Sequence, residues 1–210
     1  MNRPKRTTIS SLNLSRRGVP KRLHNSSIDD FKDYGNDSLR EVREFIRDYI
    51  DNIHLKFKNN TGLFLYGSNG VGKSMLASII VKEAYINRYS SKRVTFVDYV
   101  SEYTRVWNTK SIEERENAEA MFYHEYKAVE FLVLEELGKE LDSKLTPTVL
   151  EDCLRYREER GLPTIICTNL TPKAIVDKYG SSIESLIKGN FVPIKIVGLD
   201  KRAEYFEGRT

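Results

Sequence analysis

Residues 67–74, GSNGVGKS, constrain the fold more than any other stretch of this sequence. They match the pattern G-x-x-x-x-G-K-[ST] at every fixed position, with an apolar run before them and a helical pattern after them. Glycines in such a turn let successive backbone N–H groups point at phosphate oxygens, and the helix start adds partial positive charge. The order strand, glycine-rich turn, helix therefore predicts a phosphate-binding loop, and a chance turn is the weaker alternative.

The positions of this loop have separate expected roles. Lys73 is expected to reach the β- and γ-phosphates, and the hydroxyl of Ser74 to bind Mg²⁺. The sequence thus predicts ATP and Mg²⁺ as ligands. The expected nucleotide-binding residues are Gly67, Ser68, Asn69, Gly70, Val71, Gly72, Lys73 and Ser74.

Short apolar runs alternate with helical patterns along the chain. The pattern predicts an amphipathic helix that begins near Asn36 and ends before residues 59–62, and a helix capped by Thr146 with Pro147 in its first turn. Alternation of this kind predicts an α/β fold, a parallel sheet with helices on both faces. The expected strands are 63–66, 94–97, 131–134, 164–168 and 192–197, and the expected later helices are 73–89, 99–108, 112–126, 146–160 and 172–187.

Two adjacent carboxylates end the apolar run FLVLEELG at residues 131–138. The run predicts a buried strand that places Glu135 and Glu136 at its carboxyl end. Beside a phosphate loop, the first acid is expected to hold Mg²⁺ and the second to polarise the attacking water. Mg²⁺ demands near-ideal octahedral geometry, so the length of the Glu135 side chain matters most for direct ligation. Two solvated acids at a strand end are the alternative.

A third polar strand end occurs in TIICTNL, residues 164–170. Asn169 could hydrogen-bond the γ-phosphate or the attacking water. From its position alone, Asn169 is more typical of a turn residue that precedes the next helix.

Several motifs together resemble one family. The stretches VPKRLHNSSIDDF, GLFLYGSNGVGKSMLA, FLVLEELGKE and LRYREERGLPTIICTNL are similar to the DnaC/DnaI helicase loaders, which are AAA+ ATPases, and to their relative, the IstB transposition helper. The resemblance spans residues 18–203. It implies an AAA+ P-loop NTPase fold with a five-stranded parallel sheet, the 164–168 strand between the 63–66 and 131–135 strands, and a minimal or absent lid domain.

The resemblance also assigns residue roles. Glu135 and Glu136 stand where the family usually has two aspartates, so both are implied catalytic residues, and Glu135 with Ser74 is the implied metal pair. Asn169 occupies the sensor-1 position, and Arg202, in GLDKR, matches the sensor-2 arginine. The segment 19–31 is implied to pack near the adenine.

One departure from the family concerns hydrolysis. In residues 179–189 the family carries an arginine that reaches a neighbouring subunit, and here Leu186 stands at that position. Such an arginine is worth about 10³–10⁵ in rate. Lys188 offers a substitute charge without the planar fork of a guanidinium. We therefore expect a weak ATPase.

The resemblance implies a function and partners. We expect an ATP-binding helicase loader of DNA replication, of phage or mobile-element type, that delivers a DnaB-type hexameric replicative helicase to single-stranded DNA and forms an ATP-dependent homo-oligomer. An IstB-like transposition helper is the alternative in the same fold. A nucleotide-gated DNA-binding adaptor that hydrolyses little or no ATP is the alternative from another class. A small-molecule kinase would leave Asn169 and Arg202 unexplained.

Charge is unevenly distributed, although the formal net charge is only +4. No acid precedes Asp29, which predicts a basic flexible arm at 1–27 ahead of an ATPase domain at 28–210. The arm would suit a DNA backbone, a partner protein or simple solvation. Trp107, between Arg105 and Lys110, could stack on a base, but a buried packing role is the favoured interpretation.

Cysteine spacing and the length of apolar runs indicate the cellular compartment. Cys153 and Cys167 match no metal spacing, which favours a reducing environment. No apolar run reaches the roughly 18 residues of a membrane span. We expect a cytoplasmic protein, with an organelle transit peptide as the minor alternative.

Overall fold

A computed structural model describes residues 10–109, 111–141 and 143–198. Its centre is a five-stranded parallel sheet with the strand order β2-β3-β4-β1-β5. β4 lies between β1 and β3, which confirms the predicted order. The strands are β1 (Gly62–Tyr66), β2 (Ser91–Thr95), β3 (Phe131–Leu137), β4 (Thr164–Thr168) and β5 (Phe191–Lys195).

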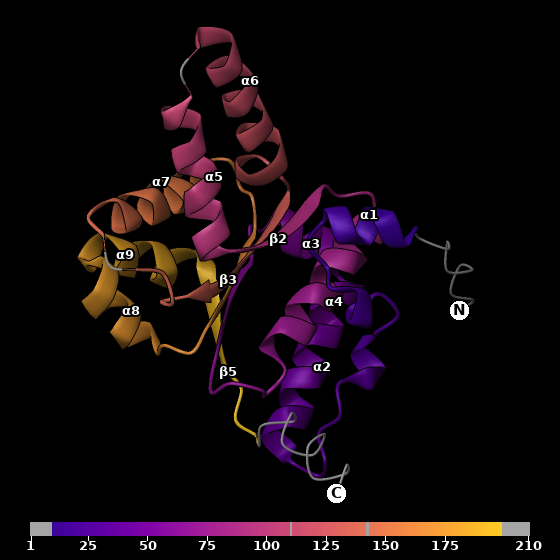
Figure 1. The fold of residues 1–210 in the computed structure, drawn as a ribbon. Coiled ribbons are helices and arrows are strands. Elements are labelled where there is room, and N and C mark those ends of the chain that lie inside the picture. The colour runs from indigo at the N-terminus through magenta and orange to yellow at the C-terminus, as the bar shows by residue number, and fades with distance from the viewer. Residues whose placement is uncertain (1–9, 110, 142, 199–210) are drawn as a thin grey trace, which may run out of the picture.

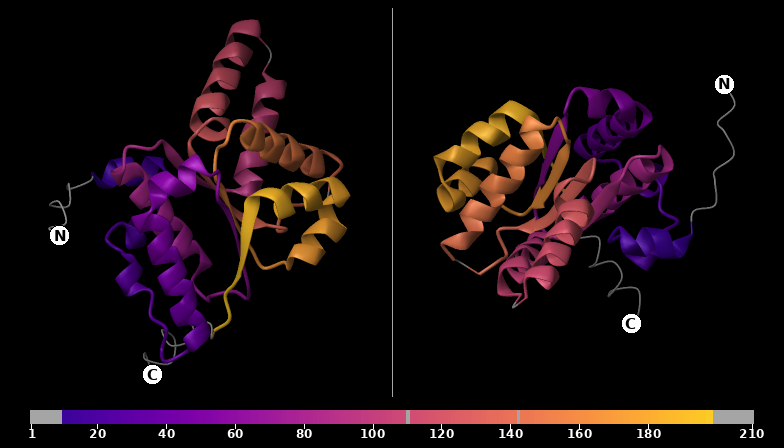
Figure 2. Two further views of the ribbon diagram at one scale, coloured as in Figure 1. Left: turned by 180° about the vertical axis from the view of Figure 1, so that it is seen from behind. Right: turned by 90° about the horizontal axis from the view of Figure 1, so that it is seen from above.

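Helices cover both faces of the sheet (Figures 1 and 2). One face packs against α1 (Ser11–Arg16), α2 (Asp37–Asp51), α3 (Ile53–Lys58) and α4 (Lys73–Ile86). The other face packs against α5 (Phe96–Asn108), α6 (Ile112–Phe122), α7 (Leu145–Glu159), α8 (Pro172–Tyr179) and α9 (Ser181–Asn190). Three shorter helical turns are η1 (Lys21–Leu23), η2 (Ile28–Asp30) and η3 (Tyr123–Lys127).

The two cores follow from the alternation of side chains along a strand. Leu63 and Leu65 of β1 lie in the core under α2 and α4, whereas Phe64 between them lies in the opposite core. In β3, Val133 lies in the core under α2 and α4, and Leu134 lies in the opposite core. Strands buried on both faces explain the continuous apolar runs in the sequence.

Several element boundaries differ from the prediction. β2 ends at Thr95, not at residue 97, because the Thr95 hydroxyl accepts a hydrogen bond from the backbone N–H of Asp98 (3.1 Å) and caps α5. The helix predicted to begin near Asn36 is capped by Asn36 and breaks at Asn52. The predicted helix 172–187 is two helices, because Gly180 adopts φ +98° between them.

The predicted cap of α7 is wrong, because the N-cap position is Lys144, two residues before Thr146. The helix begins at Leu145, and Thr146 lies inside it with a buried side chain. The Ser143 hydroxyl accepts the Thr146 backbone N–H at 3.2 Å, so Ser143 does the work expected of Thr146.

Residues 10–27 pack against the domain, so the expectation of a flexible arm does not hold for them. Leu14 and Val19 are buried in the core beside α4. The Lys82 ammonium of α4 donates to the backbone carbonyls of His24 (3.3 Å) and Ser26. Buried apolar side chains and these hydrogen bonds together hold the basic stretch against the domain. Residues 1–9 lie outside the described residues.

Helices α5 and α6 form a hairpin that projects away from the sheet (Figure 1). Trp107, near its tip, is 58% exposed, which makes the favoured prediction of a buried packing role wrong. The guanidinium carbon of Arg115 lies 4.5 Å from the centre of the indole ring. Lys110 lies outside the described residues. No helix in the described ranges is long and apolar enough to cross a membrane.

Candidate nucleotide site

The glycine-rich loop connects β1 to α4, as predicted, and its backbone requires glycine. Gly67 and Gly72 have φ of +150° and +106°. A Cβ at Gly67 would lie 2.1 Å from the carbonyl oxygen of Ile196, and one at Gly72 would lie 2.7 Å from the Phe31 ring. Side chains larger than hydrogen therefore do not fit at either position. The Phe31 contact also places the end of the 19–31 segment against this loop.

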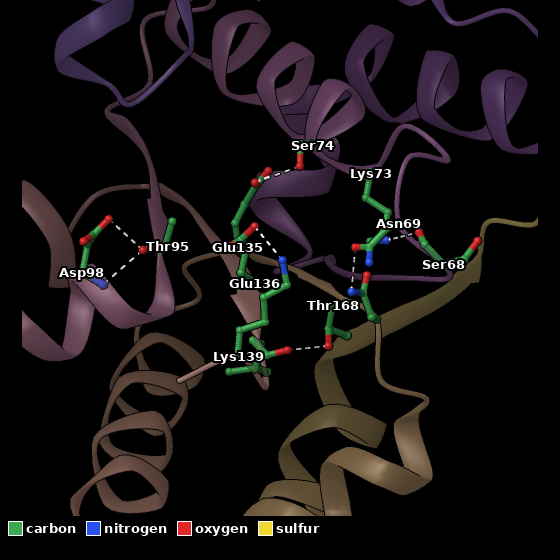
Figure 3. A network of polar contacts seen from close by, with 12 residues as sticks. Ser68, Asn69, Lys73, Ser74, Thr95, Asp98, Glu135, Glu136, Lys139 and Thr168 are labelled. Atoms are coloured by element: carbon green, nitrogen blue, oxygen red, sulfur yellow. Dashed lines mark hydrogen bonds and ion pairs between the residues drawn. The ribbon is translucent and has the colours of Figure 1, made fainter. Parts of the chain in front are cut away.

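Lys73, the first residue of α4, turns its side chain back over the loop (Figure 3). Its ammonium donates to the carbonyls of Gly67 at 2.7 Å and Ser68 at 2.6 Å. The positive charge of Lys73 is thus held at the loop, next to the amino end of α4. The ammonium charge and the partial positive charge of the helix end both favour an anion there.

Glu135 and Ser74 meet at the carboxyl end of β3 (Figure 3). The Ser74 hydroxyl donates to Oε2 of Glu135 at 2.9 Å, and Glu135 is only 2% exposed. Neighbouring ligands of an octahedral Mg²⁺ ion, each 2.0–2.1 Å from the metal, lie roughly 2.9 Å apart. A hydroxyl and a carboxylate at this spacing fit the donor set that Mg²⁺ prefers.

Glu135 has a second partner that the sequence did not reveal. Arg93 of β2 donates from Nε to Oε1 at 3.0 Å and from Nη2 to Oε2 at 2.6 Å, a two-bond pairing between guanidinium and carboxylate. The side chains are 15% and 3% exposed, so the pair is largely shielded from water. Strand register explains the contact, because Thr95 lies opposite Glu135 and Arg93 is two residues earlier on the same strand.

Glu136 is placed differently from its neighbour. It is the extra residue of a bulge in β3, since Glu135 pairs with Cys167 and Leu137 with Thr168. Glu136 adopts φ +59°, and its half-exposed side chain pairs with Lys139 at 2.9 Å. The bulge therefore leaves one glutamate buried and the other open to solvent.

Asn169 lies against the phosphate loop, as its predicted role requires. Its amide nitrogen donates to Oδ1 of Asn69 at 2.8 Å, across 100 residues of sequence. The preceding Thr168 fixes this end of β4, because its hydroxyl donates to the Leu137 carbonyl at 2.6 Å and accepts the Leu170 N–H at 3.0 Å. Arg202, the other implied sensor, lies outside the described residues.

The position implied for a trans arginine lies in the core. Leu186 of α9 is 3% exposed and packs in the core between the sheet and α7. An arginine in its place would be buried. Lys188 is well exposed and pairs with Glu184 at 2.6 Å, so it is the cation of this helix that solvent reaches.

Neither cysteine forms a disulfide. Cys153 and Cys167 are free and buried, and burial raises the pKa of both thiols. The described part of the chain contains no cluster of three or more His, Cys, Asp or Glu side chains suited to a metal.

Comparison with known proteins gives a consistent result, although no family model matches the chain. It is 28% identical over 135 residues to the replicative helicase loader DnaI of Bacillus subtilis (strain 168), which covers 64% of this chain and 40% of DnaI. It is 25% identical over 171 residues to the loader DnaC of Buchnera aphidicola subsp. Acyrthosiphon pisum (strain APS), which covers 81% of this chain and 66% of DnaC. The chain thus spans less than two thirds of the length of either protein.

Solved structures show the same fold. A crystal structure of the DnaC helicase loader has a TM-score of 0.72 at 21% identity and covers 85% of this chain and 100% of that chain. The replication initiator DnaA bound to AMPPCP and single-stranded DNA has a TM-score of 0.65 at 17% identity, covering 86% of this chain and 54% of that chain. The chain therefore has the AAA+ P-loop NTPase fold, and it resembles the replicative helicase loaders DnaI and DnaC in sequence and in structure.

Proposed function

We propose that this chain is an ATP-binding loader that delivers a hexameric replicative helicase to single-stranded DNA during replication. One observation carries the proposal: Lys73, the Ser74–Glu135 contact and the Asn169–Asn69 contact converge at the carboxyl ends of β1, β3 and β4. Ligands of open parallel sheets bind at this edge. The resemblance to DnaI and DnaC supports helicase loading in particular.

In this proposal, Ser74 and Glu135 hold Mg²⁺, which when bound neutralises charge on the phosphates. Lys73 exchanges its two carbonyl partners for phosphate oxygens, and the loop N–H groups bind the remaining oxygens. Asn169, already next to the loop, orients the terminal phosphate. Glu136, which solvent reaches, orients the attacking water and accepts its proton. Arg202, which lies outside the described residues, is proposed as a second cation only from the resemblance to the loaders.

A nucleotide-gated adaptor with little hydrolysis is the second candidate. The pairing of Arg93 with both oxygens of Glu135 favours it, because this carboxylate is engaged by a cation of the chain itself. Burial of Leu186 favours it as well, because no arginine is presented from that position. In either version we propose a cytoplasmic protein that forms a homo-oligomer with ATP. The phage or mobile-element origin stays a prediction from the sequence.

An affinity measurement tests the nucleotide site. Lys73→Ala should abolish binding of a non-hydrolysable ATP analogue, because it removes the charge that meets the phosphates. Lys58→Ala is the matched control, since Lys58 is exposed on α3, away from the loop. Equal affinity in wild type and Lys73→Ala would refute the assignment.

A DNA-binding measurement separates the loader from a transposition helper. A loader should bind single-stranded oligonucleotides in preference to duplexes when the ATP analogue is present, with an affinity that falls as salt rises. Preference for duplex DNA, together with recovery of a transposase from the native host, would favour the IstB-like alternative.

A further inference from the structure

Residues 16–18 cover the open edge of the sheet. β2 is a terminal strand, so its outer backbone groups face no other strand. The Arg93 backbone N–H donates to the Arg17 carbonyl at 2.8 Å, and the Lys92 ammonium donates to the Arg16 carbonyl at 3.0 Å. A Cβ at Gly18 would lie 1.9 Å from the Arg93 carbonyl oxygen. The amino-terminal segment is thus in direct backbone contact with β2.

One side chain connects this segment to the carboxylate of the metal pair. The Arg93 guanidinium uses Nε and Nη2 for Glu135 and Nη1 for the Gly18 carbonyl, at 2.8 Å. Because the guanidinium is planar and rigid, its three bonds share one orientation. A movement of Glu135 away from Arg93 therefore removes the anchor that also holds the Gly18 bond in place.

Arg93 and Mg²⁺ require the same oxygen. Oε2 of Glu135 accepts from both Ser74 Oγ and Arg93 Nη2. Direct ligation of Mg²⁺ by this oxygen would place a divalent cation next to the guanidinium, and the two positive charges would repel each other at close range. Glu135 can therefore ligate Mg²⁺ directly only when its hydrogen bonds to Arg93 lengthen.

We propose that Arg93 is a positioning residue that competes with Mg²⁺ for Glu135 and couples occupation of the metal site to the hold on residues 16–19. The proposal rests on the proposed function, since it presupposes that Mg²⁺ and a nucleotide bind here. Without the metal, Arg93 clamps Glu135 and the segment together. With Mg²⁺ and nucleotide bound, Glu135 turns to the metal, and the Gly18 contact loosens. Buried Leu14 keeps the part of the segment before residue 16 attached.

A Mg²⁺ titration tests the competition. Affinity for a fluorescent non-hydrolysable ATP analogue is measured across Mg²⁺ concentrations for wild type, Arg93→Met, Arg93→Lys and the control Arg155→Met, which removes an exposed pair with Glu151. The half-saturating Mg²⁺ concentration should fall about tenfold in Arg93→Met, because a charge-assisted competitor is lost. The half-saturating Mg²⁺ concentration of Arg93→Lys should lie between those of wild type and Arg93→Met, since a single ammonium cannot form the two parallel bonds. The control Arg155→Met should give the wild-type value.

Amide hydrogen exchange of the wild-type protein tests the coupling without any variant. Exchange at residues 16–19 should rise about threefold or more when Mg²⁺ is added to the protein with the analogue, whereas exchange within α7 should stay constant. A half-saturating Mg²⁺ concentration that is equal in wild type and Arg93→Met, with the analogue bound in both, would overturn the proposal, as would unchanged exchange at residues 16–19. Failure of wild type to bind the analogue at all would instead refute the nucleotide site.

Discussion

Replacement of Arg157 by methionine should destabilise the fold more than any surface change of charge. Arg157 of α7 is 1% exposed, and its guanidinium donates five hydrogen bonds. The acceptors are the Thr164 hydroxyl and the carbonyls of Lys127, Val129, Glu130 and Pro163. They lie just before β3 and at the start of β4, so this one side chain fixes the strand that contains Glu135 and the strand that precedes Asn169.

The magnitude follows from these bonds. Three of them, to Thr164, Val129 and Pro163, are fully buried. The Pro163 carbonyl keeps the Leu132 backbone N–H as a donor at 3.4 Å, so two buried acceptors are left unpaired, at about 1–3 kcal/mol each, or roughly 2–6 kcal/mol together. Burial also lowers the pKa of Arg157 to about 10, so the side chain is charged at neutral pH, and removing a buried charge offsets part of the loss. We expect a net loss of about 2–4 kcal/mol in the free energy of unfolding.

Urea unfolding at neutral pH measures this loss, and a thermal melt should show a midpoint lower by about 4–16 °C for a domain of this size. The control is Arg155→Met on the same helix, which removes only an exposed pair with Glu151 and should cost less than about 0.5 kcal/mol. The loss in the free energy of unfolding of Arg157→Lys should lie between those of Arg157→Met and Arg155→Met, because lysine keeps the charge but has fewer hydrogen-bond donors. A loss below about 1 kcal/mol in Arg157→Met would refute the reasoning that these bonds secure β3 and β4.

Three further results are expected. Glu136→Gln should keep affinity for the ATP analogue and lower turnover, whereas Glu135→Gln should weaken Mg²⁺-dependent binding itself; identical behaviour in binding and steady-state ATPase assays would contradict the separate roles. Trp107→Ala should leave the free energy of unfolding unchanged within about 0.5 kcal/mol but weaken binding of a single-stranded oligonucleotide by about 1–3 kcal/mol, and an unaffected titration would exclude base stacking. Hydrogen bonds from Arg155 and then Ser182 hold the pKa of Glu151 below its ordinary value of 4.5, so its stabilisation is present above that value and lost as the pH falls through the folded-state pKa. Glu151→Gln should therefore lose less stability than wild type between about pH 6 and pH 3, and equal losses in urea unfolding at the two pH values would contradict this.

The parallel sheet was predictable because continuous apolar runs indicate strands buried on both faces, whereas its strand order was predicted from the resemblance to the helicase loaders. Phe64 and Leu65 enter opposite cores, as expected of a strand covered on both faces. Boundaries were less predictable where local capping overrides hydrophobicity. The apolar run at 94–97 suggested a strand, but the Thr95 cap assigns Phe96 and Val97 to α5.

Contacts between polar side chains that are distant in the sequence could not be predicted from the sequence alone. Arg93 sits in a polar strand, and only the register of β2 against β3 brings it to Glu135. Arg157 did carry a signal, because it continues the buried stripe of Leu150, Cys153 and Leu154 at helical spacing. A charged residue on an apolar stripe indicates a buried, hydrogen-bonded group. Trp107 was misassigned because aromatic content alone does not distinguish a core from a projecting hairpin.

Association with the replicative helicase tests the central claim most directly. The hexameric replicative helicase of the native host is mixed with wild type or Lys73→Ala, with and without the ATP analogue and Mg²⁺, and complex masses are measured by light scattering after gel filtration. A nucleotide-controlled loader should form a complex with the hexamer whose amount changes several-fold with the analogue in wild type and not in Lys73→Ala. Absence of any complex, or association that is equal with and without nucleotide in both proteins, would contradict the account.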